Sequence, residues 1–71
     1  MYIDYSIPVC PGLRQVVKDE IAILEKAYEE NDEPTYLMHE DAVDTYLKTA
    51  LEDRDITEQE FDAMFRRFGW R

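Results

Sequence analysis

Residues 56–69, ITEQEFDAMFRRFG, decide the fold, because they contain the signals for the start of one helix and for its buried face. Thr57 and Glu60 have the spacing of a capping box, in which each side chain accepts a hydrogen bond from the backbone N–H of the other residue. Ile56 and Phe61 stand on either side of this cap, at the two positions of a hydrophobic staple. The stretch therefore predicts that a helix begins at residue 57.

The same stretch also indicates where this helix ends. Its apolar residues recur at intervals of three or four and predict one buried face: Phe61, Met64, Phe65 and Phe68. Gly69 suits the left-handed residue after a helix, while Arg66 and Arg67 complement the negative end of the helix dipole. We therefore expect a helix over residues 57–68. Residues 55–61 also resemble the start of the second helix in short C-terminal helical hairpins of bacterial proteins, which implies a hairpin.

A longer helix is predicted earlier in the chain, over residues 11–31. Pro11 suits its first turn, where a missing N–H costs nothing. Seven apolar residues follow the spacing of one buried face: Leu13, Val16, Val17, Ile21, Leu24, Ala27 and Tyr28. The polar run NDEP, residues 31–34, ends this helix.

The middle of the chain predicts another helix, over residues 35–53. Five apolar residues form its stripe: Val43, Tyr46, Leu47, Ala50 and Leu51. Its start is open between two positions, because the chain can become helical near Pro34 or remain extended until about Glu40.

The first ten residues are expected to form an extended arm. Three apolar residues alternate with polar or aromatic ones, at the two-residue period of a strand: Ile3, Tyr5 and Ile7. Pro8 and Pro11 interrupt any regular ladder. A short strand pairing of residues 2–7 with residues 35–38 is one alternative; the others are an arm lying across a helical groove or pairing with a second copy. The expected fold is thus all-α, with three helices and this arm in one domain over residues 1–71.

Composition limits the class of protein. The chain has 71 residues and a net charge of −9, with 45% hydrophobic and 13% aromatic residues, so it is too apolar for a disordered segment. Its acidity disfavours direct binding to nucleic acid or to an anionic membrane. The longest apolar run, residues 21–24, is too short to span a bilayer, and no signal peptide is recognisable. We expect a cytoplasmic protein without a disulfide, since it has one cysteine.

Neither a catalytic nor a metal-binding set of residues is apparent. Cys10 and His39 are the only residues of their kinds, and no glycine-rich loop accompanies them. Residues 53–57 resemble the start of a calcium-binding EF-hand loop. However, Glu58 stands where that loop needs glycine, and Met64 where it needs glutamate. We therefore predict no catalytic residue, metal or cofactor.

Glu20 is the one carboxylate placed among apolar neighbours on a predicted helix face. The residues three and four positions away from it are all apolar: Val16, Val17, Ile23 and Leu24. Glu20 could lie at the rim of the stripe and reach water, pair with an arginine or a tyrosine, or contact a partner. A buried carboxylate needs such a partner, because burial without one is costly.

Charge is unevenly distributed along the chain. Residues 1–31 carry a net charge of −3, residues 32–60 carry −8, and residues 61–71 carry +2. A solvated acidic surface and a helix end that obeys the dipole rule explain this pattern without any function. A recognition role is the sharper hypothesis, with nine candidate partner-binding residues: Glu40, Asp41, Asp44, Glu52, Asp53, Asp55, Arg66, Arg67 and Trp70.

Two functional hypotheses follow from these observations. The first is a non-enzymatic protein-interaction or regulatory module whose partner is another protein or a second copy of the chain. A small core favours association, whereas repulsion between two −9 subunits opposes a homodimer. The alternative is an acidic nucleic-acid mimic that inhibits a nucleic-acid-binding protein, as some phage or mobile-element inhibitors do.

The capping box yields a direct test. Thr57→Ala should lower the free energy of unfolding by ~1 kcal/mol, because it removes the side-chain acceptor for an unpaired helix N–H. Urea or thermal denaturation measures this loss. A variant as stable as the parent would show that the helix does not begin at this residue.

Overall fold

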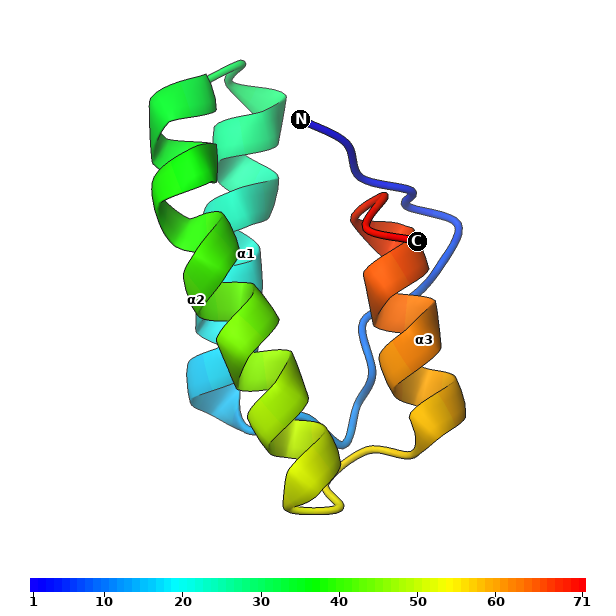
Figure 1. Ribbon diagram of the computed structural model, residues 1–71. Helices are drawn as coiled ribbons and strands as arrows, with labels where there is room; N and C mark the ends of the chain where they lie inside the picture. The colour runs from blue at the N-terminus through cyan, green and yellow to red at the C-terminus, as the bar shows by residue number, and fades with distance from the viewer.

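Three helices and no strand make up the computed structural model, which describes all 71 residues (Figure 1). The helices are α1 (Gln15–Glu29), α2 (Glu33–Glu52) and α3 (Glu58–Arg67). Helices α1 and α2 lie side by side and antiparallel, and α3 packs beside them. The arm passes over the C-terminal end of α3 and then descends beside this helix to reach α1. The predicted all-α, three-helix fold is confirmed.

The strand alternative for residues 2–7 and 35–38 is wrong, because residues 35–38 lie in the first turns of α2. The Asp32 side chain caps this helix and accepts a hydrogen bond of 3.3 Å from the Thr35 N–H. Pro34 occupies the first turn, where it leaves no hydrogen bond unmade. Of the two predicted starts, the one near Pro34 is therefore correct.

Helix α1 begins at Gln15, four residues later than predicted. Pro11 and Gly12 instead belong to a turn in which the Leu13 N–H bonds to the Cys10 carbonyl at 3.3 Å. Gly12 is packed so closely against the loop between α2 and α3 that a Cβ would lie 2.7 Å from the Asp55 carbonyl oxygen. This long-range contact, which only glycine permits, holds the turn where the local pattern predicted helix.

Helix α3 has the cap that the sequence predicts. The Thr57 hydroxyl accepts from the Glu60 N–H at 3.1 Å, and the Glu60 carboxylate accepts from the Thr57 N–H at 2.8 Å. On its inner side α3 buries Phe61 and Met64, whereas Phe65 is only partly buried. The predicted stripe is therefore correct except at Phe65.

One hydrophobic core joins the three helices and the arm. Fifteen apolar residues are buried in it: Ile3, Cys10, Leu13, Val17, Ile21, Leu24, Ala27, Tyr36, Val43, Leu47, Ala50, Ile56, Phe61, Met64 and Phe68. Because Ile3 is among them, the arm is part of the folded interior. None of the three helices combines the length and the apolar character that crossing a bilayer requires.

All three helices end in the same backbone motif. The residue after each C-cap has a positive φ: Asn31 at 55°, Arg54 at 61° and Gly69 at 74°. In each motif the next N–H bonds back to a carbonyl five residues earlier, as in the Asp55–Ala50 bond of 2.9 Å. Arg54 is the unusual member, because a side chain is strained in the left-handed region where glycine is not.

Replacing Arg54 with glycine should therefore stabilise the domain. We expect Arg54→Gly to raise the free energy of unfolding by about 0.5–1 kcal/mol, since relief of left-handed strain exceeds the added entropy of the unfolded chain. Urea denaturation measures this gain. Arg54→Ala is the control, because it removes the same charge but keeps the Cβ. A gain from alanine equal to that from glycine would contradict the strain argument.

Candidate functional site

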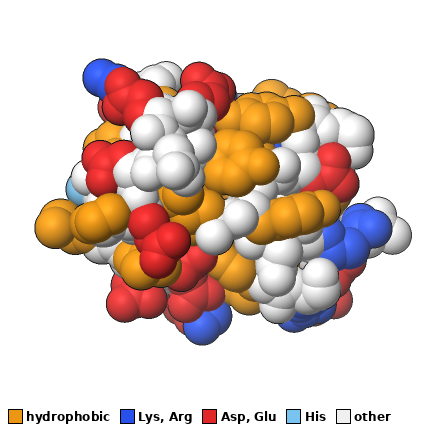
Figure 2. Space-filling model, turned by 90° about the horizontal axis from the view of Figure 1, so that it is seen from above, with side chains coloured by type: hydrophobic (Ala, Val, Ile, Leu, Met, Phe, Trp, Pro, Cys, Tyr) orange, Lys and Arg blue, Asp and Glu red, His pale blue; other side chains and the backbone are white.

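Five large hydrophobic side chains are exposed at one end of the molecule, where α1 ends and α2 begins: Met1, Tyr2, Tyr5, Leu37 and Met38. We call these five residues the apolar end. Met38 is the most open of them, with 74% of its surface exposed. Figure 2 looks onto this end and shows hydrophobic side chains across it, while Lys and Arg appear mainly at the edges of the view. The apolar end is thus built jointly by the arm and by the first turns of α2.

The arm residues of the apolar end are held by hydrogen bonds to both neighbouring helices. The Tyr36 hydroxyl of α2 donates to the Tyr2 carbonyl at 2.9 Å, and the Tyr5 hydroxyl donates to the Glu29 carboxylate at 3.0 Å. Partial burial and the bond to Glu29 raise the pKa of Tyr5 to about 12. The Tyr2 ring also packs against Gly69, where a Cβ would lie 2.9 Å from the ring. These contacts position both tyrosine rings.

Arg67 fastens the arm to α1 and α3 from inside the molecule. Its Nε donates to the Ile7 carbonyl at 2.9 Å, and its Nη2 forms an ion pair of 3.3 Å with Glu25. The guanidinium also lies 5.4 Å from the centre of the Tyr5 ring and 5.3 Å from that of Phe68. Nη1 is buried without a hydrogen-bond acceptor.

This position corrects the expectation that Arg67 lies on a partner-binding surface. Only 4% of Arg67 is exposed, because the arm closes over the end of α3 and supplies acceptors for the guanidinium. A local pattern places an arginine in the last turn of a helix but does not show which segment covers it.

The rest of the basic, aromatic tail also makes contacts within the chain. The Trp70 indole N–H donates to the Glu40 carboxylate at 3.1 Å, and its ring lies 5.2 Å from that of Phe65. Trp70 is therefore partly buried against α2 and α3. Arg66 is exposed and pairs with Asp62 at 3.1 Å.

The acidic candidates do not converge on one place. Asp53 and Asp55 pair with Arg14 at 3.6 and 2.9 Å. Asp44 pairs with Lys48 at 3.1 Å. Two other candidates, Asp41 and Glu52, are exposed and have no side-chain partner; Asp41 lies near the middle of α2 and Glu52 is its last residue. The nine predicted residues are thus distributed along the molecule, and most of them are engaged within it.

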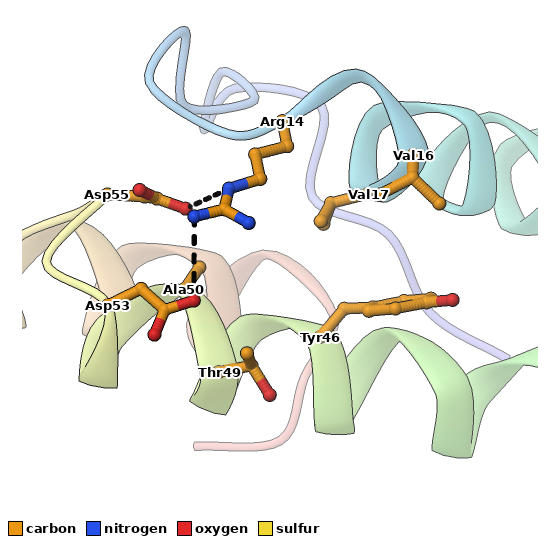
Figure 3. A pocket seen from close by; sticks show the side chains of 8 residues that line it. All are labelled: Arg14, Val16, Val17, Tyr46, Thr49, Ala50, Asp53 and Asp55. Atoms are coloured by element: carbon orange, nitrogen blue, oxygen red, sulfur yellow. Dashed lines mark ion pairs between the residues drawn. The ribbon is translucent and has the colours of Figure 1, made fainter.

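Arg14 and its two carboxylates border a small hollow between the start of α1 and the end of α2 (Figure 3). Its volume is about 130 Å³, and Val17 and Tyr46 form part of its wall. Ligand pockets usually measure about 300–1,000 Å³, so the space suits a few water molecules better than a substrate. One guanidinium here meets two carboxylates, and Glu52 and Glu58 on either side of the α2–α3 loop are exposed without an ion pair, so this end of the molecule is negative.

Glu20 has the partner that its apolar surroundings require. Its carboxylate lies 2.9 Å from Nδ1 of His39, and the side chains are 23% and 29% exposed, so the pair joins α1 to α2. The partner is the histidine, not the arginine or tyrosine considered from the sequence. Cys10 is engaged elsewhere: its Sγ lies 3.8 Å from the Glu60 carbonyl oxygen, and burial followed by the Glu60 charge raises its pKa.

Carboxylates outnumber cations around the apolar end. Residues 27–47 contain neither Lys nor Arg but have seven carboxylates: Glu29, Glu30, Asp32, Glu33, Glu40, Asp41 and Asp44. Of these, only Asp44 forms an ion pair. Lys26, in the last turn of α1, lines the same hollow as Glu30 and Asp32, so the surface around the apolar end is negative with one cation beside it.

The apolar end itself was missed by the sequence analysis, although α2 contains one signal for it. Leu37 and Met38 fall outside the helical stripe that runs through Val43 and Leu47, so a helix over residues 33–52 must expose them. That signal becomes readable once the helix is known to begin at Glu33. For the arm residues no comparable signal exists, since their exposure depends on where the arm is held.

Comparisons with protein-family models, with curated proteins and with solved structures found no match. Function is therefore inferred from the surface and interior of this chain alone.

The role of Arg67 can be tested by stability measurements. Arg67→Ala should lower the free energy of unfolding by ~3 kcal/mol, because it leaves Glu25 and the Ile7 carbonyl without their partner and opens a cavity beneath the arm. Arg66→Ala is the matched control, since it removes an exposed arginine whose i,i+4 pair contributes at most about 0.5 kcal/mol. Equal urea midpoints for the two variants would contradict a role for Arg67 in holding the arm.

Proposed function

We propose that this domain is a non-enzymatic protein-interaction module whose binding surface is the apolar end. The observation that carries the proposal is that five large hydrophobic residues are exposed near one end of a chain this small. Soluble monomers rarely leave such groups together in water, and when they do the patch commonly serves an interaction. Tyrosine and methionine are also enriched in protein interfaces.

Several features support binding over catalysis. A thiolate would be needed for a cysteine nucleophile, yet burial holds Cys10 in its protonated form. His39 is bonded to Glu20 and not to a nucleophile. The single free cysteine suits a reducing compartment, so we place the module in the cytoplasm.

The nucleic-acid mimic remains the second candidate, favoured by the seven carboxylates of residues 27–47. In that case the carboxylates themselves would contact the positive groove of a nucleic-acid-binding protein. The apolar residues would then contribute little. The two functions therefore differ in which side chains the partner needs.

Partner capture from an extract of the cells that make this protein distinguishes them. The tagged protein is compared with Leu37→Gln/Met38→Gln, which removes two exposed apolar side chains without changing charge, and partners are identified by mass spectrometry. Val16→Gln is the control, because Val16 is a half-exposed residue of α1 outside the apolar end. We expect a partner that the parent and the control retain and the double variant loses.

Two other outcomes would contradict this proposal. A partner bound equally by all three proteins, and lost only at high salt, would instead support the mimic. If the parent, the double variant and the control capture the same proteins at low and at high salt, the apolar end is not the binding surface.

A further inference from the structure

The charge around the apolar end restricts what can bind there. This inference rests on the proposed interaction function and deepens it by naming the chemistry of the partner. Glu33 and Asp41 are exposed and form no side-chain hydrogen bond or ion pair within the chain. Both lie on the same side of α2 as the exposed Leu37, because they are four residues before it and four residues after it.

A second copy of the chain fits this surface poorly. A symmetric dimer through the apolar end would bring the unpaired carboxylates of Glu33 and Asp41 from both copies close together. Like charges facing each other across an interface disfavour association, and each chain already has a net charge of −9. The same repulsion disfavours an anionic membrane.

We propose that the apolar end binds a basic amphipathic helix of another protein. Such a helix has an apolar stripe with lysines or arginines along both flanks. Its stripe would lie against Tyr2 and Leu37 and remove their exposed apolar surface from water, with Met38 at the edge, because Met38 points about 100° away from Leu37 around α2. Its flanking cations would meet the carboxylates of Glu33 and Asp41.

The residue types at the apolar end suit a helix with a variable apolar stripe. Methionine is flexible and polarisable, so Met38 can adapt to side chains of different shape. Tyr36 bonds the backbone of Tyr2 and Glu29 accepts from the Tyr5 hydroxyl, so this part of the arm is in position before binding and loses less conformational entropy. Unpaired carboxylates accelerate encounter with a cationic segment, an effect that salt weakens.

The test uses two synthetic peptides of identical composition, each about 18 residues of leucine and lysine, long enough to form a helix on binding. In one the leucines follow the three-and-four spacing of an amphipathic helix, and in the other their order is scrambled. Binding to the full chain is followed by NMR at low and high salt. We expect the amphipathic peptide to bind about tenfold more tightly than the scrambled one, with the largest shifts at the apolar end.

Matched variants separate the apolar contribution from general acidity. Leu37→Gln/Met38→Gln should weaken the amphipathic peptide by about tenfold, and Glu33→Gln/Asp41→Asn by about threefold. Glu52→Gln/Glu58→Gln removes the same number of charges from exposed, unpaired positions at the opposite end and should bind like the parent. Equal binding of the two peptides, or equal weakening by the two charge-removing variants, would reduce the effect to diffuse attraction and overturn the inference.

Two further outcomes distinguish this inference from the function on which it rests. If Leu37→Gln/Met38→Gln loses a captured partner but neither peptide binds, the interaction function stands and the basic helix is wrong. If the free chain dimerises with increasing concentration and shifts the same residues, a second copy occupies the apolar end, and this too overturns the inference.

Discussion

The buried guanidinium of Arg67 connects the three parts of this fold that no local pattern would bring together. It bonds the Ile7 carbonyl of the arm, pairs with Glu25 of α1 and belongs to the last turn of α3. A buried charge is destabilising unless it is paired and hydrogen-bonded. Here a carboxylate, a carbonyl and the faces of two aromatic rings supply that compensation. The arm is consequently held in place without any strand or helix of its own.

The position of the arm in turn determines the surface. Because Arg67 and Tyr36 hold the arm against α3 and α2, Ile3 is buried while Tyr2 and Tyr5 remain exposed beside the first turns of α2. The apolar end is therefore a consequence of the tertiary structure. An arm released from Arg67 would leave part of the core uncovered and would scatter the tyrosines that the proposed function needs.

The chain has 8 Lys and Arg residues for 17 Asp and Glu residues, and the fold places these cations unequally. Arg14 compensates two aspartates where α2 ends, and Arg67 is used inside the molecule. Residues 27–47, which supply most of the carboxylates around the apolar end, contain no Lys or Arg. Both ends of the molecule are therefore negative, and the apolar end differs in that its carboxylates accompany exposed hydrophobic side chains.

The sequence by itself determined the features that depend on residues close together in the chain. The capping box of Thr57 and Glu60 and the left-handed Gly69 each involve residues within one or two helical turns, so local physics is sufficient for them. The apolar stripes were predicted except that Val16 is half-exposed and that a few members, Phe65 among them, are only partly buried. The sequence also showed that Glu20 needs a partner, because its helical neighbours are apolar, but it could not identify His39.

Contacts between distant segments decided the rest. Gly12 meets the Asp55 carbonyl and so delays α1 to Gln15, and Arg67 meets Ile7, sixty residues earlier, and so becomes buried. Hydrophobic periodicity carries no information about which distant backbone carbonyl will face a given side chain. The all-α architecture was thus predictable from local patterns, whereas the place of the arm, and with it the apolar end, was fixed only by tertiary packing.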